Sequence, residues 1–274
     1  ITCGSKKFAQ WAKADWFNAV KCDRCGLIWM RPFVNNAGLA DYYSNYIGKR
    51  RINNKLKMKQ RAVQYKLDVK FLEHYINRGK LLDVGCNGGF FLSAFNKNFE
   101  KYGTEIDSTA VEFARKNFPF GKNVFCADLE YAPFKNNTFD AIMMRGTIEH
   151  VPDPVASIKK VSALLKKSGY YYITATPNGA SLAAEIFRDK WTLFHPVQHI
   201  WHFSPETLSK ICARFGLKLI ASDFPYLGTP YENVNENVKA MAKAIELVEK
   251  GKRAGLDISP PFYGSMMSLI FQKI

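Results

Sequence analysis

A glycine-rich loop between an expected strand and an expected helix is the feature that most constrains this chain. Residues 81–84, Leu-Leu-Asp-Val, form an apolar run with one acidic residue, and Gly-Cys-Asn-Gly-Gly follows at 85–89. A helix then opens at Phe90, and Glu105 ends the next expected strand. Such a unit brings backbone close to a ligand, and an acid on the second strand suits the hydroxyls of a ribose. The pattern predicts a site for a nucleoside-like ligand in an α/β fold.

The loop also narrows the choice of nucleoside. A dinucleotide-binding loop that starts at Gly85 needs glycine at two positions where this chain has Asn87 and Phe90. The sequence also lacks the Gly-Lys-Ser/Thr ending of a P-loop here. Asp83 and Glu105 place negative charge nearby, which disfavours a phosphate and suits a cation. S-adenosylmethionine (SAM) combines an adenosine with an ammonium and a sulfonium, and it meets both constraints.

Four segments resemble, in order and spacing, the motifs of class I SAM-dependent methyltransferases. They are 82–89, 102–105, 126–134 and 139–154. The resemblance spans roughly residues 65–220 and implies a Rossmann-like, seven-stranded, mostly parallel sheet with an antiparallel last strand. The family usually has glycine where this chain has Asn87, and asparagine is the non-glycine residue that best tolerates a positive φ.

The resemblance implies which residues hold SAM. Glu105 matches the acid that binds the ribose, and Asp128 matches the acid that meets the adenine amino group. Each acid has a structural alternative: Asp83 can cap a turn, and Asp128 can be an ordinary loop acid. Glu105 can likewise form a solvated turn pair with Asp107. The predicted cofactor-binding residues are Asp83, Gly85, Cys86, Asn87, Gly88, Phe90, Glu105, Ile106, Asp128, Leu129, Arg145 and Tyr46.

Methyl transfer is an in-line displacement at a sulfonium methyl, and a hydroxyl acceptor must also lose a proton. His150 follows the strand expected at 139–145, where this fold presents groups to the transferred methyl, and we predict that it is the general base. The alternative is a structural histidine held by a loop carbonyl. Glu149 is predicted to orient His150 or to contact the ammonium side of the cofactor. His199 opens a stretch similar to a His-x-x-Phe-Ser segment of the resembled subgroup, with one extra residue, and is also predicted to be catalytic.

The histidines after residue 190 raise the alternative of a metal site. Pro196 interrupts the segment that holds His195, His199 and His202, and no carboxylate follows nearby before Glu206. This disfavours a metal there. Trp201 and Tyr226 are candidates to line an acceptor pocket, with core packing as the alternative.

The first residues have the cysteine pattern of a small metal module. Cys22 and Cys25 form a C-x-x-C-G knuckle, and Cys3 looks like the end of a second knuckle whose first cysteine would precede residue 1. Two knuckles make a zinc ribbon, so Cys3, Cys22 and Cys25 are the predicted zinc ligands. Three unpaired thiols are the alternative. The remaining cysteines are expected to be buried free thiols: Cys86, Cys126 and Cys212.

The same region resembles the front end of a bacterial methyltransferase subgroup. The resemblance lies in the knuckles, in segment 26–32 and in the tyrosine-rich segment 41–46. Members of the subgroup are often associated with sugar, polysaccharide or secondary-metabolite modification. The tyrosines, Tyr46 among them, are candidates to close over the cofactor, or else they pack against the core.

We expect three parts along the chain. They are a zinc-ribbon-like module at 1–34, a helical cap at 35–78, and a SAM-binding domain at 79–274 with insertions at 178–203 and 225–263. Long connections at the ligand edge of a sheet often form lids or substrate caps. The expected strands are 80–85, 101–106, 123–126, 139–145, 169–175, 217–223 and 264–273, and the expected helices are 89–98, 108–117, 154–166, 205–215 and 235–251.

The charge is strongly positive and uneven. The chain has a formal charge of +15, and residues 47–80 hold eleven Lys/Arg against two Asp/Glu, which is +9 of that total. This suggests an anionic partner, with a solvated helix face as the alternative. The sequence has no run of 18 apolar residues and no apolar signal-peptide core, so we expect no transmembrane segment and a cytoplasmic location. It does not begin with Met, so we expect the natural start to lie upstream.

These observations favour a SAM-dependent methyltransferase acting on an anionic small molecule, such as a sugar or a glycan or polysaccharide precursor, most readily at oxygen. One alternative is an RNA methyltransferase that holds nucleic acid on the basic 47–80 region. The other is a SAM-binding adaptor without catalysis, which the joint presence of Asp83, Glu105, Asp128 and His150 disfavours.

Overall fold

The computed structural model describes residues 2–14, 16–32, 34, 38, 42 and 55–274. Tyr46, predicted to close over the cofactor, lies outside the described residues, as do residues 35–37, 39–41 and 43–54 of the helical cap expected at 35–78.

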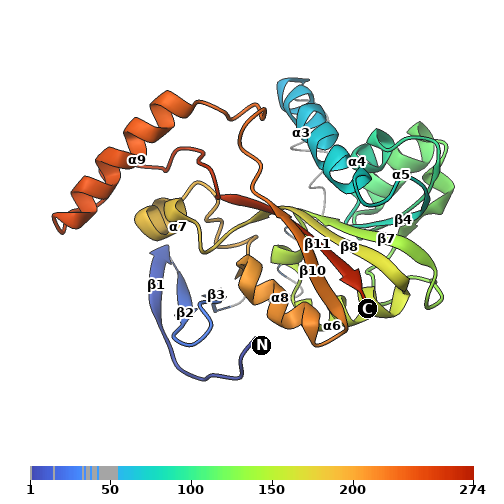
Figure 1. Ribbon diagram of the computed structural model, residues 1–274, viewed down its shortest axis with the longest axis horizontal. Coiled ribbons are helices and arrows are strands. Elements are labelled where there is room, and N and C mark those ends of the chain that lie inside the picture. Colours follow the sequence, from blue (N-terminus) through green and yellow to red (C-terminus); the bar gives the residue numbers. More distant parts are fainter. Residues whose placement is uncertain (1, 15, 33, 35–37, 39–41, 43–54) are drawn as a thin grey trace.

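A seven-stranded sheet organises the larger part of the chain (Figure 1). Its strand order is β10-β11-β8-β7-β4-β5-β6, and every pairing from β6 to β8 is parallel, whereas β11 runs antiparallel to β8 and β10. The predicted mostly parallel sheet with an antiparallel last strand is therefore confirmed. The strands are β4 (Gly79–Val84), β5 (Phe99–Glu105), β6 (Val124–Cys126), β7 (Phe139–Arg145), β8 (Leu165–Pro177), β10 (Leu217–Asp223) and β11 (Met266–Lys273).

Helices cover both faces of this sheet, because its central strands are apolar on both sides. Leu81 packs in one core and Leu82 in the other, as expected for neighbours on one strand. The first core is closed by α3 (Lys55–Glu73), α4 (Phe90–Ala94) and α5 (Ser108–Asn117), and the second by α6 (Pro154–Leu164) and α8 (Pro205–Ala213).

Most predicted element boundaries agree with the structure within a few residues, and the helix expected at 89–98 is the main exception. That helix, α4, ends at Ala94. The side chain of Asn96 accepts a hydrogen bond from the backbone N–H of Asn98 at 2.9 Å, a local turn that competes with helix continuation. Ser204 caps α8 as predicted, its hydroxyl accepting from the backbone N–H of Thr207 at 3.1 Å.

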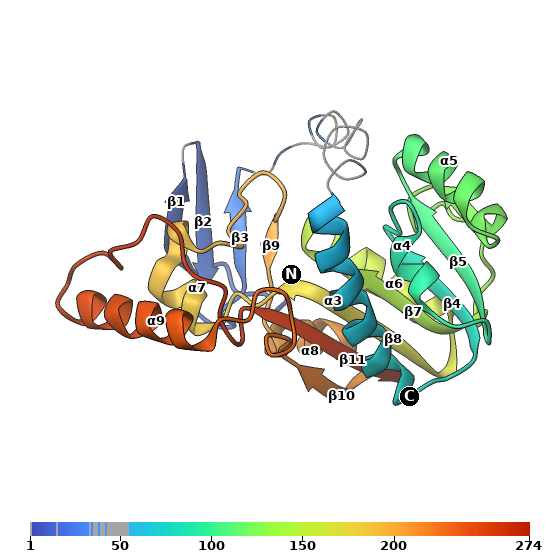
Figure 2. The same ribbon diagram turned by 90° about the horizontal axis from the view of Figure 1, so that it is seen from above.

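The N-terminal residues form a second, antiparallel sheet together with a strand from far along the chain. Its order is β1-β2-β3-β9, with β1 (Phe8–Ala14), β2 (Phe17–Cys22), β3 (Ile28–Arg31) and β9 (Trp201–His202). β9 belongs to the 178–203 insertion, and Figure 2 shows it beside β3. Trp11 and Met30 share a core with Trp191 of this insertion. Strands β1–β3 and the 178–203 segment therefore share one sheet and one hydrophobic core. The predicted domain boundaries stay a prediction.

The 225–263 insertion contributes α9 (Val234–Glu249), which lies beside α7 (Leu182–Phe187) on the side of the molecule that carries β1–β3 (Figure 2). Across the described part of the chain, no helix combines the length and apolar character that a membrane span requires.

One buried ion pair fixes α3 over the edge of the main sheet. Nε of Arg145, at the end of β7, lies 2.8 Å from Oδ2 of Asp68 on α3. The guanidinium also stacks on the rings of Tyr65 and Phe91, at 4.6 and 5.6 Å from their centroids. This arrangement sets one wall of the site described next.

Candidate active site

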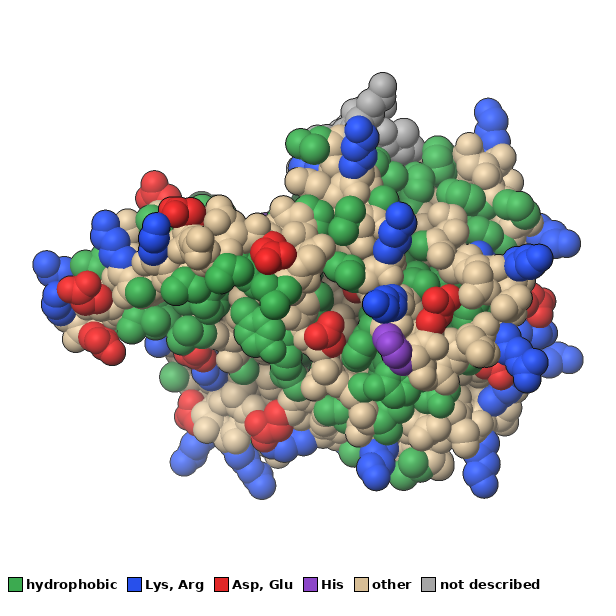
Figure 3. Space-filling model, turned by 45° about the horizontal axis from the view of Figure 1, so that its top comes forward, with side chains coloured by type: hydrophobic (Ala, Val, Ile, Leu, Met, Phe, Trp, Pro, Cys, Tyr) green, Lys and Arg blue, Asp and Glu red, His purple; other side chains and the backbone are tan. Residues whose placement is uncertain are grey.

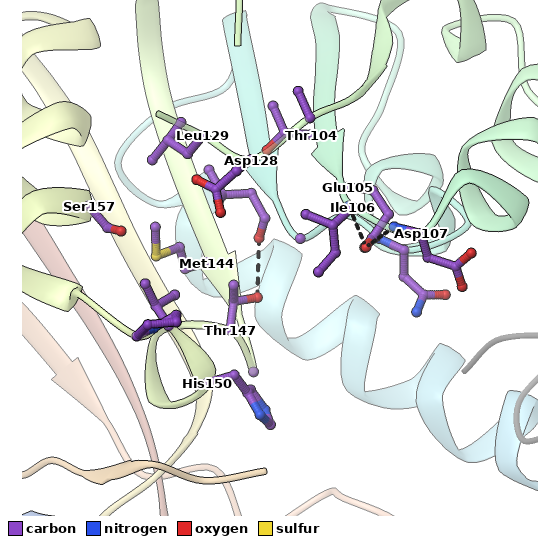
Figure 4. Close-up of a pocket in the computed structure, with 17 residues that line it drawn as sticks. Thr104, Glu105, Ile106, Asp107, Asp128, Leu129, Met144, Thr147, His150 and Ser157 are labelled. Carbon is purple, nitrogen blue, oxygen red and sulfur yellow. Dashed lines mark hydrogen bonds between the residues drawn. The ribbon is translucent and has the colours of Figure 1, made fainter. Parts of the chain in front are cut away.

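A cavity of about 200 Å³ opens at the carboxyl ends of β4, β5 and β7 (Figure 4). The strand order reverses beside β4, and ligands of open α/β sheets bind at such a switch point. Six of the predicted cofactor-binding residues line this first cavity: Gly85, Asn87, Glu105, Ile106, Asp128 and Leu129.

Glu105 organises the glycine-rich loop from the end of β5. Its Oε2 accepts the backbone N–H of Asn87 at 2.8 Å, and its Oε1 accepts those of Ile106 at 2.8 Å and Asp107 at 3.0 Å. Asn87 has φ 52°, as its tolerance of positive φ predicted. The carboxylate is therefore held by three N–H donors at the cavity wall, and about one of its four lone-pair sites, on Oε2, remains for a hydroxyl of a ribose.

Asp83 is a buried acid immediately behind this loop. Its Oδ1 has no hydrogen-bond partner among the residues that the structure describes. Burial raises its pKa to about 8, Glu105 adding to the rise and Arg145 opposing it. Asp83 does not line the first cavity. A neutral buried acid at neutral pH is ready to ionise when a cation approaches.

This burial predicts how stability changes with pH. A carboxyl whose folded pKa is raised above its unfolded value of 3.8 stabilises the fold at low pH, and that contribution is lost as pH rises toward 8. Asp83→Asn removes the ionisation, so its advantage in Tm over the wild type is expected to grow between pH 5 and pH 8, by about 2 °C or more for a chain of this size. Differential scanning fluorimetry of the ligand-free protein measures it.

The exposed Asp257→Asn serves as the matched control and is expected to show no such trend. A Tm difference between Asp83→Asn and wild type that stays constant with pH would mean that Asp83 is already ionised in the folded chain.

Asp128 and Leu129 follow β6 and also line the first cavity. Oδ1 of Asp128 accepts the backbone N–H of Glu130 at 3.0 Å, which holds the carboxylate in a local turn while it still borders the cavity. Leu129 is buried and supplies an apolar surface for a flat ring. Adenine recognition by this pair stays a prediction.

Four other predicted cofactor residues do not line the first cavity. Cys86 is buried, and its Sγ lies only 2.5 Å from the position that a Cβ on Gly103 would take. Phe90 packs on Phe113, and Gly88 lies close to the same ring. Arg145 borders a different cavity and pairs with Asp68. Their assignment to the cofactor stays a prediction.

A second cavity of about 480 Å³ lies next to the first, and residues of both segments predicted to be insertions border it. Their role as substrate caps stays a prediction. Its walls include Tyr65 of α3, His195 of the first insertion and Tyr226 of the second. The hydroxyl of Tyr226 accepts from Nδ2 of Asn237 at 2.8 Å. Trp201, the other candidate for an acceptor pocket, is core instead: it is buried, and its Nε1 donates to the carbonyl of Val151 at 2.9 Å.

The two cavities meet at Gly85, Gly146 and His150, which line both. Figure 4 shows His150 at one end of the first cavity, past Thr147. Its Nδ1 lies 2.9 Å from the carbonyl oxygen of Gln198 and must donate to it, so in the neutral ring Nε2 carries the lone pair. The carbonyl of Gln198 is thus the loop partner expected if His150 were only structural. The same contact also leaves Nε2 as the nitrogen that can accept a proton.

The predicted catalytic residues Glu149, His150 and His199 converge here. Oε1 of Glu149 is 3.7 Å from Nε2 of His150, and the two imidazole rings are 4.8 Å apart between centroids. Burial raises the pKa of Glu149 to about 7. Burial also lowers the pKa of His199 well below its usual value, with nearby His150 adding to the effect, so His199 is neutral at pH 7.

The suggested grouping of His195, His199 and His202 is only partly seen. The rings of His195 and His199 meet edge to face with their centroids 4.9 Å apart, whereas His202 is fully buried, and burial lowers its pKa to about 3. Glu149, which lies 50 residues before His199 in the sequence, supplies a carboxylate close to His199. The sequence prediction considered only carboxylates near these histidines along the chain, and it stays untested for His195 and His202.

Sequence reasoning missed several residues of the site. Thr147 donates to the carbonyl of Val84 at 3.1 Å and ties the β7 loop to the glycine-rich loop. Gln198 orients His150, and Thr176 donates to Oε2 of Glu149 at 3.1 Å. The position of Thr147, two residues after the end of β7, is a weak sequence signal for a site residue. Gln198 acts through its backbone carbonyl, so its side-chain type gives no sequence signal.

The three N-terminal cysteines also converge. Their sulfurs lie within 4.8 Å of one another, and those of Cys3 and Cys22 are 3.6 Å apart. Burial raises the pKa of Cys22, but the backbone N–H groups of Cys25 and Arg24 outweigh it and lower the pKa to about 7. Three thiols with N–H donors aimed at the sulfur fit a zinc knuckle, and zinc itself stays a prediction. Of the other cysteines, two are buried as expected and Cys126 is exposed.

Comparisons with known proteins bear on this geometry. A family model described as a methyltransferase domain matches residues 50–222. A ubiquinone biosynthesis O-methyltransferase of Coxiella burnetii is 31% identical over 124 residues, covering 43% of this chain and 53% of the relative. A tRNA U34 carboxymethyltransferase of Nautilia profundicola is 32% identical over 96 residues, covering 32% of this chain and 31% of the relative.

Solved structures share the fold. The crystal structure of a SAM-dependent methyltransferase from Thermotoga maritima, a possible histamine N-methyltransferase, superposes with a TM-score of 0.55 at 19% identity. The superposition covers 81% of this chain and 96% of that one. The chain spans 53–58% of the length of the first curated relatives that it matches.

Proposed function

Because the chain belongs to the class I SAM-dependent methyltransferases, we propose that it methylates an oxygen atom of a polar small molecule held in the second cavity. The observation that carries this proposal is the wall shared by the two cavities. His150 borders both of them, so a donor in the first and an acceptor in the second would meet beside its imidazole.

Different residues of the chain would hold the cofactor and deprotonate the acceptor. When bound, SAM supplies an electrophilic methyl group on a sulfonium centre. Glu105 would hold the ribose, and Leu129 would pack on the adenine. His150, with Nε2 unprotonated, would take the proton of the acceptor hydroxyl as the oxygen attacks. Glu149 lies 3.7 Å from Nε2 and would stabilise the imidazolium that forms.

The lining of the second cavity supports a flat or cyclic, anionic acceptor. Tyr65, Tyr226 and Tyr231 offer aromatic faces, and Arg61 adds positive charge. A sugar or glycan precursor that carries an acidic group fits this lining. A phenolic acceptor fits it as well, and an O-methyltransferase of ubiquinone biosynthesis is among the relatives, which favours oxygen as the acceptor atom.

RNA is the second candidate acceptor. It is supported by the tRNA-modifying relative and by four exposed lysines on α3: Lys57, Lys59, Lys66 and Lys70. On the face seen in Figure 3, Lys and Arg side chains (blue) are spread out with acidic ones (red) between them, rather than gathered in one basic surface. This distribution favours the small molecule.

An acceptor panel tests the proposal. The wild-type chain with SAM is expected to release S-adenosylhomocysteine with at least one hydroxylated, anionic small molecule, such as a uronic acid, a nucleotide-linked sugar or a catechol acid. Release only with tRNA, at a rate that falls steeply with salt, would instead establish the RNA alternative.

A further inference from the structure

A cluster of one carboxylate and two imidazoles lies on the wall of the second cavity. Glu149 and His150 come from the turn Ile148–His150 after β7, and His199 comes from the insertion just before β9. One ligand atom from each, either a carboxylate oxygen or an imidazole nitrogen, lies within 4.8 Å of the other two. All three residues border the second cavity.

Both histidines are held in the same tautomer. Nδ1 of His150 lies 2.9 Å from the carbonyl of Gln198, and Nδ1 of His199 lies 2.8 Å from the carbonyl of Leu193. A carbonyl only accepts, so each Nδ1 carries the proton and each Nε2 carries a lone pair. Metal-binding histidines have this arrangement, because the backbone partner fixes the ring and leaves Nε2 as the ligand.

The carboxylate is supported in the same way. Oε2 of Glu149 accepts the hydroxyl of Thr176 at 3.1 Å, while Oε1 faces Nε2 of His150 at 3.7 Å. Glu149 is only 2% exposed, so its charge is costly unless a cation offsets it. Two imidazoles and a buried carboxylate facing an open cavity supply the charge and the ligands for a divalent ion.

We propose that Glu149, His150 and His199 bind one divalent transition-metal ion, with open coordination positions directed into the second cavity. Two nitrogens and one oxygen suit Zn²⁺, Mn²⁺, Co²⁺ or Fe²⁺, and a three-ligand site leaves room for a ligand from solvent or substrate. Ligand atoms at about 2.1 Å from one ion are about 3.0–3.4 Å apart, so binding draws these three together by up to about 1.8 Å.

The consequence for the reaction rests on the proposed function. A hydroxyl of the acceptor beside the ion has a lowered pKa and loses its proton to water. The oxygen then forms a bond to the methyl carbon, and the carbon–sulfur bond breaks with its electron pair staying on sulfur. The products are the methyl ether, S-adenosylhomocysteine and a hydronium ion. In this form Nε2 of His150 is a ligand, and water takes the proton in its place.

Manganese binding tests the site on the full chain. Protein treated with EDTA and dialysed is titrated with Mn²⁺ at pH 7.5, with electron paramagnetic resonance reporting free Mn²⁺. Mn²⁺ is chosen because it prefers nitrogen and oxygen ligands to thiolates. The same titration on Cys22→Ser, which disrupts the N-terminal cysteine cluster, is expected to give the same stoichiometry.

The matched variants are His199→Ala and His195→Ala. His195 contacts the ring of His199 edge-on and borders the same cavity but lies outside the three-residue cluster. We expect one Mn²⁺ per chain for the wild type and His195→Ala, and an affinity at least ~10-fold weaker for His199→Ala. Glu149→Gln, which keeps the shape of the side chain, is expected to lose binding to the same extent if His199→Ala proves unstable.

Two results would overturn the site: no Mn²⁺ bound by the wild type below about 1 mM, or equal affinities in all variants. Titration of the same samples with S-adenosylhomocysteine separates the two proposals. If the cofactor product binds and Mn²⁺ does not, the metal site alone fails. If S-adenosylhomocysteine does not bind, the proposed function fails whatever the metal result.

Discussion

Glu105→Ala is expected to weaken the binding of S-adenosylhomocysteine at least ~100-fold, measured by isothermal titration calorimetry. The change removes the acceptor for three backbone N–H groups, two of which order the turn after β5 and one of which fixes Asn87 in the glycine-rich loop. It also removes the acid predicted to bind the ribose. A hydrogen bond to a charged group contributes about 1.5–3 kcal/mol, so the loss of one bond to the ligand together with the loss of the Asn87 anchor in the loop accounts for ~100-fold.

The control is Glu112→Ala, an exposed glutamate on α5, which is expected to bind like the wild type. Glu105→Gln keeps one carbonyl oxygen and should fall between the two. Equal affinity for wild type and Glu105→Ala would show that the first cavity does not hold the nucleoside as proposed.

His150→Ala is expected to lower kcat at least ~100-fold, because general-base catalysis typically contributes that much. The affinity for S-adenosylhomocysteine should change by less than ~10-fold, since the loop and Glu105 remain intact and one lost contact is worth about 1 kcal/mol. The measurement pairs initial rates on an acceptor identified from the panel with calorimetry on the same variant. If the metal site exists, the same variant also loses an ion ligand, so both proposals predict a fall in kcat.

The exposed His74→Ala is the matched control and should retain wild-type kcat and affinity. Addition of EDTA to the wild type distinguishes a metal-bound from a metal-free mechanism. Unchanged kcat in His150→Ala would exclude His150 both as the base and as an essential ligand.

Local patterns were enough to predict the main sheet. The central strands β4 and β7 are short, mostly apolar runs, and strands from β4 to β8 that follow one another in sequence are also neighbours in the sheet, apart from one crossover at β4. Glu105 was identifiable because it ends a strand at a fixed spacing from the loop. Capping residues such as Ser204 gave helix starts for the same reason, since a cap is a contact between near neighbours.

Contacts between distant residues could not be predicted in this way. β9 is only two residues long and pairs with β3, which lies more than 160 residues earlier in the sequence. A strand this short has no hydrophobic periodicity from which it could be predicted. The convergence of His199 with Glu149 depends on that pairing, because β9 anchors the insertion beside the turn after β7. Arg145 was predicted from the sequence to bind the cofactor. Its guanidinium instead pairs with Asp68 on α3, a helix whose position relative to the sheet the sequence pattern does not predict.

The central claim is that the first cavity holds the cofactor of a methyltransferase, and calorimetric titration of the wild-type chain with S-adenosylhomocysteine tests it most directly. We expect one molecule bound per chain with a Kd below about 100 µM. No measurable binding by folded protein at about 1 mM ligand would contradict the claim.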